Sequence, residues 1–308
     1  MAPRGSKISS KDEQVRQFLQ PEVVSKLHNM EIRARLVVEG FIQGLHRSPY
    51  HGFSVEFAEY RQYIPGDEPR FVDWKLFGKT DRYYVKVFEE ETNLKGMILL
   101  DKSASMGFKG AGISKLRWGS FLAAALSFMM IKQQDASGLV VFDDAIRTFL
   151  PARSVRGQLY QVLKELEVVE PSERTKIGDA LHHMAERLKR RGLIILISDL
   201  FDDPDTIMNG LKHFRHRQHE VLVFHVLDDL ERTFDYKEEA RFVDMETNQE
   251  IRSQPWFVRG EYQERVENWT NSLARRCREQ HIDYVPMTTS APYDLALMAF
   301  LNKRTHLG

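Results

Sequence analysis

One acidic residue and two hydroxyl side chains directly follow a run of apolar residues. The stretch reads MILLDKSASMGFKG (residues 97–110), so Asp101 ends the apolar run, and Ser103 and Ser105 follow at alternate positions. Carboxylate and hydroxyl oxygens are hard ligands of the kind that Mg²⁺ prefers. These side chains could therefore hold a metal ion, hold a phosphate, or have only a structural role.

Two later segments supply oxygens of the same type. Thr175 opens a predicted helix after the loop EPSERTKIG, and the apolar run LIILISD ends in Ser198 and Asp199. Ligands of open parallel sheets bind beyond the carboxyl ends of the strands, near the point where strand order reverses. We therefore predict a metal site at one edge of a sheet, formed by Asp101, Ser103, Ser105, Thr175 and Asp199.

The small number of charged ligands in this set has a consequence for binding. Magnesium usually keeps several waters and takes few carboxylates in proteins. Because one or two charged ligands do not neutralise the ion, a carboxylate from another molecule can bind to it. We expect Mg²⁺, with Mn²⁺ or Ca²⁺ as alternatives, and a protein partner that supplies an Asp or Glu.

The elements that must position these residues follow an alternating pattern from residue 94 onwards. The runs GMILLD, ASGLVVFD, LIILISD and EVLVFHVLD are almost continuously apolar, which is typical of strands buried on both faces. Helical patterns separate them and predict a mostly parallel, doubly wound α/β sheet. We take residues 94–308 as one α/β domain with a hairpin insertion near residues 231–260.

Residues 1–93 have a different character. Residues 11–40 have helical spacing, and Pro21 marks a break or a new start. Residues 41–91 are rich in glycine, aromatic and charged residues, with turns at Pro65–Pro69 and a strand-like alternation in DRYYVKVFEEE. We expect a helical N-terminal segment followed by a turn-rich region that contains strands.

Two sets of motifs resemble known families. DKSAS, with the later Thr and the later strand-end Asp, resembles the D-x-S-x-S, T, D signature of von Willebrand factor A domains with a metal-ion-dependent adhesion site. The segment before it resembles the bacterial family called "domain of unknown function 58", in which E-F-x-x-x-R-x-Y-x-P-G-D-x-x-R-x-x-D-W precedes such a domain. The resemblance covers roughly residues 40–300, and the matching residues are Glu56, Phe57, Arg61, Tyr63, Pro65, Gly66, Asp67, Arg70, Asp73 and Trp74.

The resemblance implies a role for each ligand. Asp101 and Asp199 would act on the ion largely through water, and the direct ligands would be Ser103, Ser105 and Thr175. Many adhesion-type sites have glycines before the Thr, whereas this chain has a Glu–Arg pair at residues 173–174. Members of the family are commonly encoded beside MoxR-type AAA+ ATPases, so the resemblance implies such an ATPase as the partner, in the assembly or maturation of other proteins.

Composition narrows the function further. The chain has 44 Lys plus Arg and 44 Asp plus Glu, so its overall charge favours neither nucleic acid nor a membrane as partner. Cys277 is the single cysteine, which fits a reducing compartment, and its helical surroundings predict a structural thiol. The N-terminus does not resemble a secretory signal, and the longest apolar run, FLAAALSFMMI, is too short to span a bilayer. We expect a cytoplasmic protein with no membrane insertion.

Several alternatives compete with the adhesion site. A phosphohydrolase of haloacid-dehalogenase type also places a carboxylate at the end of its first strand, but it requires D-x-D, and Ser103 occupies the second acidic position. A scaffold with a vestigial metal site would bind its partners through residues 41–91. In a purely structural role, Ser103 or Ser105 would cap the helix that begins near Ile113 or satisfy amides of the loop. Asp203 is predicted to cap the helix that begins after it, at Pro204. Asp202 either lies in the outer shell of the metal or has no role in metal binding. We favour a binding module that is not an enzyme.

Overall fold

The computed structural model describes residues 20–25, 29–45, 60–62, 78, 82–86, 94–172, 177–243 and 250–305. Thr175, predicted as a metal ligand, and most of the motif in residues 56–74 lie outside these ranges.

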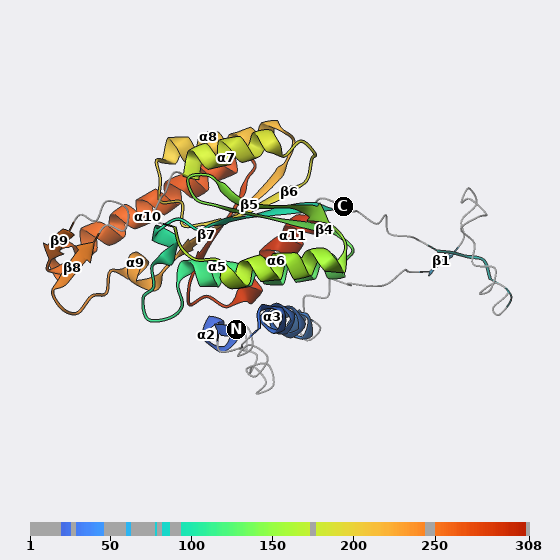
Figure 1. Ribbon diagram of the computed structural model, residues 1–308, viewed down its shortest axis with the longest axis horizontal. Helices are drawn as coiled ribbons and strands as arrows, with labels where there is room; N and C mark the ends of the chain where they lie inside the picture. Colours follow the sequence, from blue (N-terminus) through green and yellow to red (C-terminus); the bar gives the residue numbers. More distant parts are fainter. Residues whose placement is uncertain are drawn as a thin grey trace, which may run out of the picture.

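A six-stranded sheet forms the centre of the fold (Figure 1). Its strands are β3 (Lys95–Asp101), β4 (Ala136–Phe142), β5 (Ile146–Arg153), β6 (Leu193–Ser198), β7 (Glu220–Leu227) and β10 (Asp283–Thr288). They lie in the order β10–β7–β6–β3–β4–β5, and every neighbouring pair is parallel except β4 with β5. The prediction of a doubly wound, mostly parallel α/β sheet is confirmed. The chain order reverses between β3 and β6, where ligands of such sheets bind.

Helices cover both faces of this sheet (Figure 1). Alternate residues of β3 face opposite sides: Ile98 and Leu100 join one apolar core, and Met97 and Leu99 join the other. The first core contains α5 (Lys115–Lys132), α6 (Arg156–Val168) and α11 (Tyr293–Thr305). The second core contains α7 (Ile177–Arg187), α8 (Pro204–His216) and α10 (Pro255–Glu279).

The N-terminal helices add a further layer beyond α5. The helices are α2 (Pro21–Ser25), which begins at the predicted break, and α3 (Met30–Leu45). Ala34, Val38 and Phe41 of α3 are buried in the first core, and Figure 1 shows α3 outside α5. Since α5 lies between the sheet and α3, it is apolar on almost every side rather than amphipathic.

The remaining elements are short. They are β1 (Tyr60–Gln62) paired with β2 (Tyr84–Lys86), the 3₁₀ helix η2 (Ser105–Gly107), α9 (Asp229–Thr233), and the antiparallel pair β8 (Ala240–Val243) and β9 (Glu250–Ser253). The β8–β9 pair projects from one end of the α/β body together with the start of α10 (Figure 1). Within the part of the chain that the structure describes, no helix is long and apolar enough to cross a membrane.

Candidate functional site

The carboxyl ends of β3 and β6 bring two of the predicted residues to the same edge of the sheet. β3 and β6 are adjacent and parallel, so Asp101 at the end of β3 lies beside Ser198 at the end of β6. The Ser198 hydroxyl donates a hydrogen bond of 2.7 Å to Asp101 Oδ2, and both side chains are fully buried. Asp199 follows immediately, and its side chain is also fully buried.

The loop after β3 folds back on Asp101. The amide of Ser103 donates a hydrogen bond of 2.8 Å to Asp101 Oδ1, and Ser105 begins η2. The hydroxyl oxygens of Ser103 and Ser105 lie 3.1 Å apart. The predicted alternative, in which one of them caps the next helix, is wrong, because Ser114 is the N-cap of α5 and accepts a hydrogen bond from the amide of Arg117.

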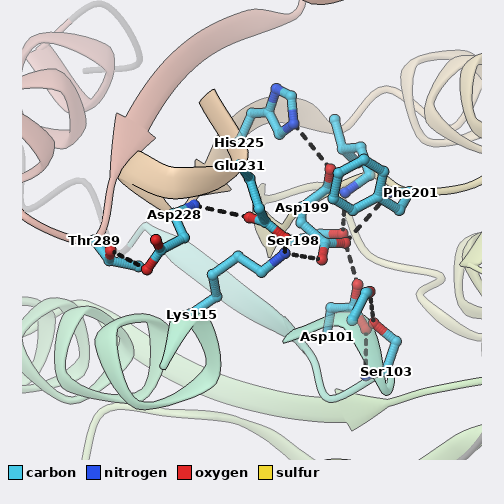
Figure 2. Close-up of polar contacts among 12 residues, drawn as sticks. Asp101, Ser103, Lys115, Ser198, Asp199, Phe201, His225, Asp228, Glu231 and Thr289 are labelled. Carbon is cyan, nitrogen blue, oxygen red and sulfur yellow. Dashed lines mark hydrogen bonds and ion pairs between the residues drawn. The ribbon is translucent and has the colours of Figure 1, made fainter. Parts of the chain in front are cut away.

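A buried lysine, which the sequence analysis did not single out, lies beside this edge. Lys115 is the first residue of α5, and its side chain is 0% exposed. Its ammonium group lies 2.7 Å from Asp199 Oδ2 and 2.6 Å from Glu231 Oε1 of α9 (Figure 2). Burial alone would lower the pKa of this ammonium, but the two carboxylates outweigh burial and raise its pKa above the ordinary value.

The lysine thereby ties α9 to the sheet. Asp228 caps α9 by accepting from the amide of Leu230, while Glu231 accepts from the amide of Asp228, which completes a capping box. Asp228 also accepts hydrogen bonds from the amide of Gly110 at 3.1 Å and from the hydroxyl of Thr289 at 2.9 Å. Three loops that are distant in sequence therefore meet at this carboxylate.

His225 supports Asp199 from the neighbouring strand β7. Its Nε2–H donates to the Asp199 carbonyl oxygen at 2.8 Å, and its Nδ1 bonds the hydroxyl of Tyr284. Burial lowers the pKa of this imidazole to about 4, so the ring is neutral at physiological pH.

Acidic side chains outnumber basic side chains at this edge of the sheet. Asp101, Asp199, Asp228 and Glu231 are all largely or fully buried, and Lys115 is the one basic side chain within ion-pairing distance of them among residues 94–172, 177–243 and 250–305. Burial, followed by the nearby charge of Asp199, raises the pKa of Asp101 to about 7. A carboxylate with no cationic partner here is costly to ionise, and a bound cation would offset that cost.

These contacts decide which of the predicted ligands suit a divalent cation. Asp101, Ser103 and Ser105 present hard oxygens close together, which fits Mg²⁺. Asp199 is already neutralised by Lys115, and its other oxygen accepts from the Phe201 amide at 3.3 Å. No group of three or more His, Cys, Asp or Glu suited to a metal occurs in the described ranges, so an ion here would depend on the hydroxyls.

The acidic residues after Asp199 serve the neighbouring helices. Asp203 is the N-cap of α8 and accepts from the amide of Thr206 at 2.8 Å, which confirms its predicted role. Asp202 accepts a hydrogen bond from the amide of Gly178 at the start of α7, at 3.2 Å. It thereby anchors the helix that follows the loop containing Thr175.

Comparison with protein families gives one match that spans most of the chain. The model of a family described as "Protein of unknown function DUF58" matches residues 59–271. Two curated relatives are the uncharacterized proteins Rv1480 of Mycobacterium tuberculosis (strain ATCC 25618 / H37Rv) and Mb1516 of Mycobacterium bovis. Each is 28% identical over 211 residues, which cover 68% of this chain and 66% of the relative, slightly less than two thirds of its length.

Solved structures similar to this chain include bacterial proteins and one domain named as von Willebrand factor A. The hypothetical protein BatB from Bacteroides thetaiotaomicron is 18% identical, with a TM-score of 0.46 over 69% of this chain and 99% of that one. An aerotolerance-related membrane protein from Bacteroides fragilis is 21% identical, also with a TM-score of 0.46, over 68% and 99%. The SpRpn10 VWA domain is 14% identical, with a TM-score of 0.35 over 67% and 94%.

Proposed function

The chain belongs to the DUF58 family and has a doubly wound, mostly parallel α/β sheet, and from this premise we propose that it is a protein-binding module of the von Willebrand factor A type, not an enzyme, whose binding depends on Mg²⁺. Mn²⁺ and Ca²⁺ are the alternative ions. The proposed ligands are Asp101, Ser103 and Ser105, with Thr175 completing the set and Asp199 acting through water.

The excess of buried carboxyl groups over basic groups at the carboxyl edge of the sheet is the observation that supports this proposal. Asp101 is fully buried beside two hydroxyls and has no basic partner in the described part of the chain, whereas Asp199 has Lys115. Buried charges in proteins are normally paired or coordinate metals. An ion held by one nearby carboxylate and neutral hydroxyls would retain a positive charge that attracts a carboxylate of the partner.

Within this proposal, the residues of the chain orient the ligands. Ser198 and the Ser103 amide hold the two oxygens of Asp101 in place through hydrogen bonds of 2.7 and 2.8 Å. Lys115 neutralises Asp199, so Asp199 adds polarity to the site without adding a full uncompensated charge. The site would therefore keep the ion electrophilic.

The proposed partner is a protein that presents an Asp or Glu, and a MoxR-type AAA+ ATPase is the candidate that the family resemblance implies. Its proposed role is the assembly or maturation of other proteins.

A pull-down from native lysate tests the proposal. The purified chain is used with Mg²⁺, with a chelator, and as Asp101→Ala and Thr175→Ala variants whose folding is verified by circular dichroism. Asp283→Ala is the matched control, because this exposed carboxylate lies at the opposite edge of the sheet. We expect the wild type and the control to retain the partner in the presence of Mg²⁺, and the partner is identified by mass spectrometry. We expect the chelator and each of the two site variants to abolish this binding. Equal retention under all conditions would contradict the metal dependence and would redirect attention to residues 41–91.

A further inference from the structure

Two histidine side chains from neighbouring helices meet on the surface of the α/β body. His182 lies on α7 and His213 lies on α8, and the Nδ1 atoms of the two rings are 3.0 Å apart. The ring centres are 4.4 Å apart, and the rings are tilted by 43°. The His182 side chain is 56% exposed, so an ion in solvent can reach the pair. The two residues are 31 positions apart in the chain, so their sequence spacing does not predict the contact.

Close packing of α7 against α8 brings the two histidines together. Figure 1 shows the two helices side by side on one face of the sheet. A Cβ atom at Gly178 of α7 would lie 2.2 Å from a side-chain atom of α8, and one at Gly210 of α8 would lie 2.7 Å from a side-chain atom of α7. Glycine at both positions therefore permits the close approach. His182 follows Gly178 by four residues and His213 follows Gly210 by three, so each histidine lies on the contact face of its helix.

A neighbouring carboxylate favours the form of His182 that binds metals through Nδ1. Glu186 lies one turn after His182 on α7, and its Oε1 is 3.8 Å from Nε2 of His182. Its negative charge favours a proton on Nε2, which leaves a lone pair on Nδ1, the atom that faces His213. Metal-bound histidines commonly have a carboxylate or a carbonyl oxygen at the other ring nitrogen. Burial, followed by the charge of His182, lowers the pKa of His213, so that ring is also neutral at pH 7, the form in which imidazole binds a metal.

Without an ion, the same geometry is a single hydrogen bond between the two rings. One Nδ1 carries the proton and the other accepts it, so the rings adopt different tautomers. Because Glu186 favours a proton on Nε2 of His182, His182 is the acceptor and Nδ1 of His213 is the donor. An ion takes the place of this proton, which moves through solvent to Nε2 of His213. Both Nδ1 atoms then donate their lone pairs to the ion.

The donor set selects the class of ion. Two nitrogens that bind one ion at about 2.0–2.1 Å and at angles of about 90–110° are about 2.8–3.4 Å apart, and the observed 3.0 Å lies within this range. Neutral imidazoles suit Zn²⁺, Ni²⁺ and Cu²⁺, whereas Mg²⁺ prefers oxygen ligands. His213 lies in the last turn of α8, where the helix dipole favours a cation. The positive charge of Arg217 acts on His213 in the opposite sense, so nitrogen coordination, more than charge, has to hold the ion.

We propose that His182 and His213 form a metal site for Zn²⁺ or a similar transition-metal ion, bound through the two Nδ1 atoms. The site is distinct from the proposed Mg²⁺ site at the carboxyl ends of β3 and β6, and it does not depend on that proposal. No third His, Cys, Asp or Glu joins the pair as a ligand in the described ranges, so water fills the remaining coordination positions. An ion held in this way exchanges with solvent and can accept a ligand from another molecule.

Calorimetric titration of ZnCl₂ into the full chain tests this inference, with excess Mg²⁺ present to occupy the proposed oxygen site. The site variant is His182→Gln/His213→Gln, which retains polar side chains at both positions. The matched control is His183→Gln/His216→Gln, which removes two exposed histidines from the same two helices. We expect one saturable Zn²⁺ site in the wild type and in the control. The affinity of the site variant should be at least about tenfold lower, since the loss of even an outer-shell partner of a metal ligand costs about 10–100-fold.

The ligands can be identified directly in the wild type by ¹⁵N NMR of the histidine rings. Zn²⁺ should shift the Nδ1 resonances of two of the eleven histidines, and the single variants His182→Gln and His213→Gln assign these resonances. Three results would each overturn the proposal. They are no saturable Zn²⁺ binding by the wild type, an affinity of the site variant equal to that of the wild type, and Zn²⁺-dependent shifts confined to other histidines.

Discussion

Removal of the buried ammonium of Lys115 is expected to destabilise the fold strongly. The substitution Lys115→Met keeps the length and the apolar stem of the side chain but leaves Asp199 without its cation. Both side chains of the pair are 0% exposed, so water cannot replace the lost contact. Glu231 is 14% exposed and can regain solvent, so most of the cost falls on Asp199. Loss of one partner from a buried pair costs about 3–5 kcal/mol, which is the decrease we expect in the free energy of unfolding.

Urea unfolding followed by circular dichroism measures this change. The double variant Lys115→Met/Asp199→Asn removes both charges, so we expect it to recover at least 1–2 kcal/mol of that loss, on the order of the cost of one unpaired buried charge. Arg265→Met is the control, because the pair of Arg265 with Glu261 is 78% and 66% exposed and is worth about 0–1 kcal/mol. A loss in Lys115→Met no larger than in the control, or a double variant no more stable than the single one, would refute the reasoning.

Three further expectations concern other buried groups. The pKa of His225 is lowered from 6.5 to about 4, so the unfolded chain binds more protons between these values, and stability should fall as the pH drops from about 6.5 to 4, by about 3 kcal/mol in total. His225→Gln should lose this dependence in urea unfolding at several pH values, whereas an unchanged slope would show that another group carries it. Burial raises the pKa of Cys277 to about 12, so the folded chain should not react with a thiol reagent at pH 8, while one thiol should react in guanidinium; rapid labelling of the folded chain would contradict this. Asp228→Ala should cost about 2–4 kcal/mol, because it removes a cap and leaves buried donors unsatisfied, and Asp203→Ala should cost less, because this cap is exposed; equal losses would argue against the role of Asp228 in joining the three loops.

The main sheet could be predicted because its strands are buried on both faces. Runs such as LIILIS in β6 have no polar residue before the terminal Ser198, and helical patterns of sufficient length separate them. The antiparallel direction of β5 was not predicted, since its residues are half-buried and the run IRTFLP does not reveal strand direction. The sequence pattern predicts the helix α10 only from Tyr262, whereas it begins at Pro255, because the exposed Trp256, Phe257 and Val258 break the amphipathic pattern in its first turn.

The adjacency of Asp101 and Ser198 followed from the alternation of strands and helices, but the contacts of Lys115 did not. A lysine at the start of a helix normally lies on the surface, and its partners here are 84 and 116 residues away. The five residues of α9 are too few to produce a periodic signal, so the contact of Glu231 with Lys115 could not be predicted either. The available clue was that α5 is apolar on almost every side, which predicts a buried helix whose few charged residues need partners.

Calorimetric titration of Mg²⁺ into the chain tests the central claim most directly. The wild type is compared with Asp101→Asn, which keeps the size of the side chain and removes its charge, and with Asp283→Asn at the opposite edge of the sheet as control. We expect one saturable Mg²⁺ site in the wild type and in the control, and its loss in Asp101→Asn with the fold retained. Saturable binding that is unchanged in Asp101→Asn, or no binding by the wild type at millimolar Mg²⁺, would contradict it.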